Sequence, residues 1–168
     1  MDKRIEALVF HCSDSGFGDA ALVKEWHVQG NGWKDIGYNG VILNGFRKST
    51  KAYASADDGL FEIGRGLDLD TIIEKEEVGA HAKGFNENSL GFCLIGVNKF
   101  SIAQFQTAYN LVRLFRNIVP GVKLLGHYEL PTAGGKTCPN FDMNVFREIC
   151  EKDGVKIDAS IVSRLLKS

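Results

Sequence analysis

The sequence predicts a single α/β domain in which helices cover both faces of a β-sheet. Short apolar segments of strand length alternate with segments that have the periodicity of amphipathic helices, an order typical of α/β folds. The chain has 168 residues, enough for one hydrophobic core, and it shows no internal repeat or linker. We therefore expect one domain over residues 1–168.

The composition narrows the classes of partner. The formal net charge is −1, so no strong field attracts nucleic acid or acidic membranes. No apolar run approaches the ~20 residues that a membrane-spanning helix needs. The first residues lack the apolar segment of a signal peptide. We expect a monomer without nucleic-acid or membrane partners, synthesised in the cytoplasm without a signal peptide and acting elsewhere only after release.

The first predicted strand covers residues 5–12. Its consecutive apolar residues 8–10 indicate a strand that is covered on both faces. Because side chains alternate along a strand, His11 can point into a cleft while Cys12 points into the packing.

A helix is predicted over residues 20–29, with Asp19 as its N-cap and the Gly-Asn-Gly sequence at 30–32 as its end. His27 has the spacing of a residue on the helix surface or at the edge of the core, which is the more common role for such a histidine than metal binding.

Two strands, 38–43 and 60–65, are predicted to pair as a hairpin. The loop between them, residues 45–59, is basic and longer than the usual ~2–5 residues. We interpret it as a solvated loop rather than as a binding site for an anionic, sugar-bearing substrate. Residues 66–78 follow as a connection with at most one helical turn.

The second half of the chain repeats the alternation of strand and helix. A strand over 90–97 precedes the clearest amphipathic helix, which starts at Ser101 and ends before Pro120. A short strand is predicted at 122–125, and it places His127 at the surface just after its end. Two short helices are predicted at the end of the chain, over 143–150 behind the N-cap Asp142 and after Asp158.

The stretch from Leu124 to Asp142 contains the residues best suited to bind a metal. His127 and Cys138 supply an imidazole and a thiolate, and His11 offers a second imidazole. Nitrogen and sulfur ligands suit Zn²⁺, and three protein ligands leave the fourth position open, as in catalytic zinc sites. Taken one at a time, each residue is more often an ordinary surface or core residue than a ligand.

The other cysteines do not suggest a disulfide framework, because no signal peptide is apparent and the core is large. Cys12 and Cys150 are expected to be buried thiols. Cys93 is ambiguous from the sequence pattern.

Four blocks of sequence carry a family resemblance: LVFHCSDS, GWKDIGYNGVI, GAHAKGFNENSLGFCLIG and GHYEL…KTCPNFD. In this order they resemble the type 2 N-acetylmuramoyl-L-alanine amidases, which include the phage amidase lysozymes and the peptidoglycan recognition proteins. The resemblance covers the chain from Ile5 to about Asp142. It implies a central mixed sheet flanked by helices, one Zn²⁺ ion and bacterial peptidoglycan as the partner.

The resemblance also implies roles for single residues. His11, His127 and Cys138 match the zinc ligands, and Tyr38 and Lys136 match the catalytic tyrosine and lysine. His81 and Asn86 lie in a block that resembles part of the substrate groove, so we expect them to bind substrate.

The implied reaction is hydrolysis of the amide between N-acetylmuramic acid and L-alanine, as in a phage or prophage endolysin. Lys136 would stabilise the oxyanion, and Tyr38 would orient water and relay a proton. The cell-wall-recycling branch of the family has Asp as its third ligand and Glu where Cys93 stands, so this chain is more similar to the phage lysozymes. The same comparison leaves two positions open for Cys93, one facing the cleft and one packed in the core. The alternative is a binding module without activity, and the presence of Cys138 favours the enzyme.

Overall fold

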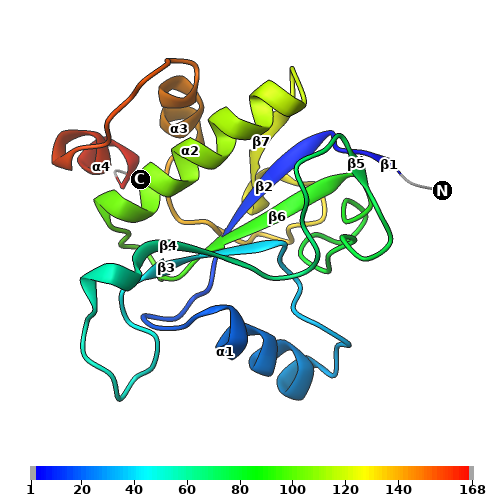
Figure 1. Ribbon diagram of the computed structural model, residues 1–168, viewed down its shortest axis with the longest axis horizontal. Helices are drawn as coiled ribbons and strands as arrows, with labels where there is room; N and C mark the ends of the chain where they lie inside the picture. The colour runs from blue at the N-terminus through cyan, green and yellow to red at the C-terminus, as the bar shows by residue number, and fades with distance from the viewer. Residues whose placement is uncertain (1–2, 167–168) are drawn as a thin grey trace.

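The computed structural model describes residues 3–166, so both ends of the predicted 1–168 domain lie outside the described part. Its centre is a five-stranded sheet of order β4-β3-β6-β2-β7 (Figure 1). The strands are β2 (Ala7–Cys12), β3 (Gly40–Asn44), β4 (Asp58–Ile63), β6 (Ser89–Leu94) and β7 (Lys123–Gly126).

Four of these strands are parallel, and only β4 runs antiparallel, to its hairpin partner β3. The mixed α/β sheet that the sequence and the resemblance predict is therefore confirmed. Strands β2 and β6 lie in the middle, and every one of their residues is buried. Their near-continuous apolar sequences reflect this, because both faces of a parallel sheet are covered.

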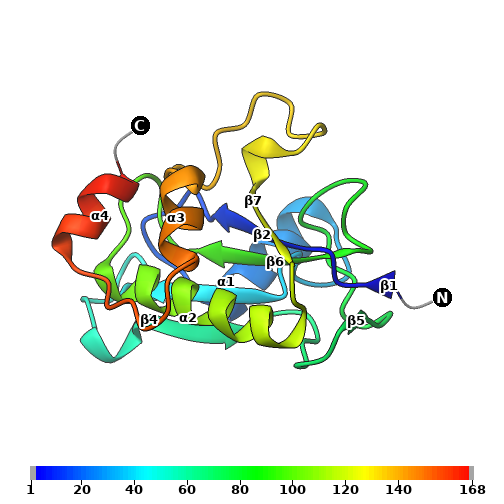
Figure 2. The same ribbon diagram turned by 90° about the horizontal axis from the view of Figure 1, so that it is seen from above.

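Helices cover the two faces unequally. The long α2 (Ile102–Ile118) lies on one face with α3 (Met143–Cys150) and α4 (Ala159–Leu165), whereas α1 (Ala20–Glu25) lies on the other (Figures 1 and 2). Successive side chains of β2 point to opposite faces of the sheet. On the face covered by α2 and α3, Phe10 packs edge to face against Phe146 of α3, with 5.1 Å between the ring centroids, and the main core forms on this side.

The predicted helix starts agree with the structure. Asp19, Ser101 and Asp142 each accept a hydrogen bond from a backbone N–H of the first turn, and Ser101 forms a capping box with Gln104. The predicted helix at 20–29 has a different second half: α1 ends at Glu25, and a π-helical turn, η1 (Trp26–Gly30), continues it.

Some predicted boundaries were wrong. The strand expected over 38–43 begins at Gly40, and the strand expected over 90–97 ends at Leu94. The connection over 66–78, where at most one helical turn was expected, also contains β5 (Ile72–Ile73), which pairs with β1 (Lys3–Arg4). Two-residue strands have no detectable periodicity, so the sequence pattern could not reveal this pair.

Within residues 3–166, no helix has both the length and the apolar character needed to cross a bilayer.

Candidate metal centre

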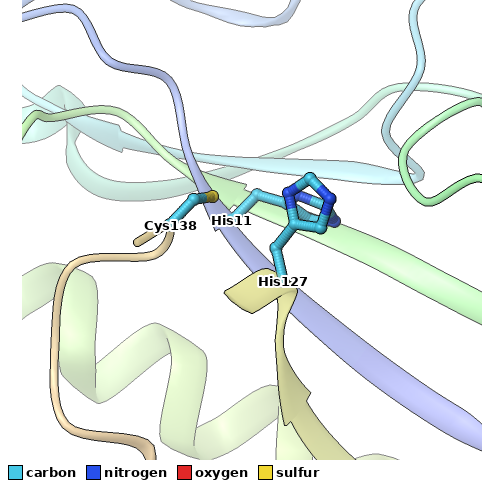
Figure 3. Close-up of side chains that lie close together, drawn as sticks. All are labelled: His11, His127 and Cys138. Carbon is cyan, nitrogen blue, oxygen red and sulfur yellow. The ribbon is translucent and has the colours of Figure 1, made fainter. Parts of the chain in front are cut away.

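His11, His127 and Cys138 converge on one point (Figure 3). One ligand atom from each residue lies within 4.8 Å of the other two. His11 is next to last in β2, and His127 begins a 3₁₀ turn, η3 (His127–Glu129), immediately after the neighbouring strand β7. The parallel pairing of β2 and β7 therefore places both histidines at the carboxyl end of the sheet, where α/β proteins usually build their sites.

The turn that carries His127 is fixed by an ion pair. Glu129 accepts hydrogen bonds from both terminal nitrogens of Arg147 in α3, at 2.8 and 2.7 Å, and one from the backbone N–H of Gly126 at 2.7 Å. The same guanidinium donates to the carbonyl of Leu124 at 2.9 Å. This two-point pairing fixes the geometry of η3, because it constrains orientation as well as distance.

Cys138 is held against the end of β2. The backbone N–H of Cys12 donates to its Sγ at 3.1 Å. The neighbouring Cys12 thiol and burial raise the pKa of the Cys138 thiol. Thiolate at this position therefore requires a compensating positive charge, which a divalent cation would provide.

Both histidines are held in the neutral form that metal ligation requires. Burial lowers the pKa of His11 well below its usual value, and the neighbouring His81 and His127 lower it further. Burial and the charge of Lys136 lower the pKa of His127. Two neutral imidazoles and one thiol are a donor set that fits Zn²⁺. Their role as ligands stays a prediction.

A cleft of about 550 Å³ opens over these residues. Lys136 lies in the exposed loop at its rim, and Tyr38 forms part of its wall, with its ring centroid 5.0 Å from that of His11. Burial and the nearby thiols of Cys93 and Cys138 raise the pKa of Tyr38 well above its usual value. The phenol therefore keeps its proton at neutral pH. The cleft brings both predicted catalytic residues next to the candidate metal ligands.

Cys93 is fully buried and pairs in register with His11 across β2 and β6. It is absent from the lining of the cleft, and burial raises the pKa of its thiol well above the usual value. Its thiol lies on the His11 side of the sheet, close to Tyr38, and is completely covered, so it is packed beneath the cleft and is not exposed in it.

Neither His81 nor Asn86 has the exposed position expected of a residue in a substrate groove. His81 is 7% exposed, and its ring lies at the bottom of the cleft beside His11. The Asn86 side-chain oxygen accepts the backbone N–H groups of His81 and Ala82, both at 2.9 Å, and Asn86 does not line the cleft. Its contacts stabilise the loop that carries His81. Substrate binding by either residue stays a prediction.

The sequence pattern did not reveal that His27 and Trp33 line the same cleft. Their rings lie 4.8 Å apart, and Nδ1 of His27 accepts the backbone N–H of Gly37 at 2.9 Å. His27 was expected on the helix surface or at the edge of the core. The half-buried position of His27 agrees with the edge of the core, and the π-helical turn η1 that carries it is not predicted by an α-helical pattern.

The loop over residues 45–59 lies away from the cleft lining. Its Arg47 forms ion pairs with Asp19 at 3.0 Å, Asp57 at 2.9 Å and Glu62 at 3.1 Å. This arginine therefore anchors the loop to α1 and β4. A larger hollow of about 730 Å³ lies between α2, β7 and α3, and none of the candidate ligands lines it.

Comparison with known proteins agrees with this arrangement. The endolysin of Escherichia phage T7 is 31% identical over 149 residues, which cover 82% of each chain, and the endolysin of Enterobacteria phage T3 gives the same values. A scan against models of protein families gives no match.

Solved structures share the fold. An N-acetylmuramoyl-L-alanine amidase from Clostridium intestinale, an endolysin, superimposes with a TM-score of 0.66 over 86% of this chain and 82% of its own, at 22% identity. The Drosophila peptidoglycan recognition protein LB gives a TM-score of 0.61 over 95% of this chain and 90% of its own, at 23% identity. The chain belongs to the family of the phage T7 and T3 endolysins, and its fold is that of the N-acetylmuramoyl-L-alanine amidases and peptidoglycan recognition proteins.

Proposed function

We propose that the protein is a zinc-dependent N-acetylmuramoyl-L-alanine amidase, an endolysin that cleaves the amide bond between N-acetylmuramic acid and L-alanine in bacterial peptidoglycan. The observation that carries this proposal is the convergence of His11, His127 and Cys138 within 4.8 Å at a cleft that also contains Tyr38 and Lys136. The kinship with phage endolysins supports the same reaction class.

His11, His127 and Cys138 would hold one Zn²⁺ ion. When bound, the ion would supply a Lewis acid that activates water near neutral pH and polarises the scissile carbonyl. Three protein ligands leave room for water and substrate, as in other catalytic zinc sites.

Lys136 would stabilise the negative charge that develops on the carbonyl oxygen. It lines the cleft, and its charge lowers the pKa of both His11 and His127. A preorganised donor of this kind typically contributes ~10²–10³ in rate.

Tyr38 would orient the attacking water and carry a proton to the nitrogen of the leaving L-alanine. The phenol lines the cleft and can both donate and accept a hydrogen bond, which this role requires. Its position beside His11 places it on the same side of the cleft as the candidate metal.

A digestion of purified sacculi tests the reaction. We expect new amino termini on L-alanine and no new reducing sugars, with loss of activity on chelation and recovery on addition of Zn²⁺. New reducing ends would identify a glycosidase. Binding of sacculi without any cleavage would identify a recognition module.

A further inference from the structure

The ring of His81 is the one buried imidazole beside the candidate ligands that the proposed reaction does not use. Its Nδ1 lies 3.0 Å from Nε2 of His11. Its Nε2 lies 3.3 Å from the carbonyl oxygen of Ser89 and 3.4 Å from the Ser89 hydroxyl. Both nitrogens of His81 therefore have partners inside the protein.

These partners determine where the proton of His81 lies. A carbonyl oxygen can only accept a hydrogen bond. The Ser89 hydroxyl gives its own hydrogen to the carbonyl of Phe85 at 2.6 Å, so towards His81 it also can only accept. Nε2 of His81 must therefore carry a hydrogen, and in a neutral ring Nδ1 is then an acceptor.

The same logic extends to His11. If Nδ1 of His81 accepts, Nε2 of His11 must donate, so the proton of the neutral His11 ring lies on Nε2. The other nitrogen of His11, Nδ1, is then free of hydrogen and has a lone pair available to a metal. The chain of donors thus runs in one direction, from His11 through His81 to Ser89.

The fold makes space for this contact. A Cβ atom at Gly91, on β6 beside β2, would lie 2.4 Å from Cγ of the His81 ring, and one at Gly79 would lie 2.8 Å from its Cδ2. Both distances are too short for real atoms. Glycine at these positions therefore allows the imidazole to lie flat against the sheet within reach of His11. Asn86 fixes the backbone of His81 from the other side.

We propose that His81 is a positioning residue that fixes the tautomer and orientation of His11, so that Nδ1 of His11 faces the metal. The proposal rests on the metal centre of the proposed function and assigns His81 to that centre rather than to the substrate groove. Outer-shell partners of this kind typically contribute a factor of about 10–100 in metal affinity.

The first test reads the tautomer directly in metal-free protein. The chain has four histidines, so nitrogen-15 NMR of the imidazoles can be assigned with one variant for each. We expect hydrogen on Nε2 and none on Nδ1 of His11 in the wild type, and a mixture of tautomers in His81→Ala. A wild-type His11 with hydrogen on Nδ1, or an unchanged tautomer in His81→Ala, would overturn the proposal.

The second test measures Zn²⁺ affinity by competition with a chromophoric chelator, without substrate. His81→Ala should weaken binding about 10–100-fold. His81→Asn should stay within a few-fold of wild type, because Oδ1 of asparagine takes the place of the Nδ1 acceptor. Gly91→Ala should weaken binding through displacement of the ring, and it provides a second readout if His81→Ala does not fold. His27→Asn, a matched change at a histidine that lines the same cleft, should leave affinity unchanged.

The outcomes separate the two proposals. A wild-type protein that binds no Zn²⁺ would remove the proposed function, and the His11 tautomer would still decide whether His81 fixes it. If the wild type, His81→Ala and Gly91→Ala all bind Zn²⁺ equally tightly, the positioning role of His81 is refuted and the metal centre stands. A residue that only contacts substrate would change KM and would not change affinity measured without substrate.

Discussion

The backbone N–H of Cys12 donates a hydrogen bond to Sγ of Cys138 at 3.1 Å, across 126 positions of sequence. Cys12 directly follows His11, so this bond ties the first candidate ligand segment to the last. A backbone donor aimed at sulfur also favours the thiolate form. The loop over residues 130–142 is thereby held close to β2, and the metal centre depends on this closure.

Cys138→Ser should abolish turnover while the fold is retained. A serine hydroxyl is a poor replacement for a thiolate ligand, and the loss of Zn²⁺ affinity should exceed the ~10–100-fold typical of an outer-shell partner. Metal analysis and release of L-alanine amino termini measure the two effects. Cys150→Ala removes a buried thiol of α3 and is the matched control, expected to lose some stability and keep its zinc. A Cys138→Ser enzyme with full zinc and turnover would refute the assignment.

Lys136→Ala should lower kcat by ~10²–10³ and leave Zn²⁺ affinity and KM nearly unchanged, because the ammonium is needed mainly when charge develops on the carbonyl oxygen. Steady-state kinetics on a soluble muropeptide separate kcat from KM. Lys51→Ala, at an exposed lysine of the loop over 45–59, is the control and should behave as wild type. An unchanged kcat for Lys136→Ala would show that this lysine is an ordinary loop residue.

Tyr38→Phe should lower kcat by about 10² or more, the usual contribution of a positioned proton donor. The aromatic ring remains, so packing beside His11 should persist and the melting temperature should change little. Tyr53→Phe also removes one hydroxyl, from a tyrosine that is 49% exposed and outside the cleft lining, and should leave turnover unchanged. If Tyr38→Phe keeps wild-type kcat, the proton must travel by another route.

The metal-free protein should lose stability as the pH falls from about 6.5 towards 4. Burial lowers the pKa of His81 to about 4, and His11 and His127 shift in the same direction. The folded state therefore binds fewer protons than the unfolded state in this range, and the free energy of unfolding decreases with decreasing pH.

For His81 alone, the shift from its usual value to about 4 corresponds to roughly 3 kcal/mol. Urea denaturation in the presence of a chelator, at a series of pH values, measures this effect. In His81→Asn, the free energy of unfolding should depend less on pH than in the wild type. A free energy of unfolding that stays constant down to pH ~4 would mean that these histidines take up protons as readily in the folded state as in the unfolded state.

Local sequence signals predicted most of the elements correctly. The helix starts at Asp19, Ser101 and Asp142 follow from side chains that satisfy free N–H groups at nearby positions, so they are encoded within a few residues. The covered strand β2 follows from its short apolar run, and the long helix α2 follows from its helical periodicity. The pair β1–β5 and the π-helical turn at Trp26–Gly30 do not, because they depend on contacts with distant segments.

The sequence by itself determined the α/β class, the helix caps and the residue types suited to zinc, since each of these is set by neighbours along the chain. Only the tertiary structure decided that His11, His127 and Cys138 share one point, that Cys93 is packed away and that His81 lies behind His11. The parallel pairing of β2 with β6 and β7 brings His11, Cys93 and His127 together, and loop contacts bring Cys138 and His81 to them. Distances between segments more than a hundred positions apart are set by packing, and no local pattern contains them.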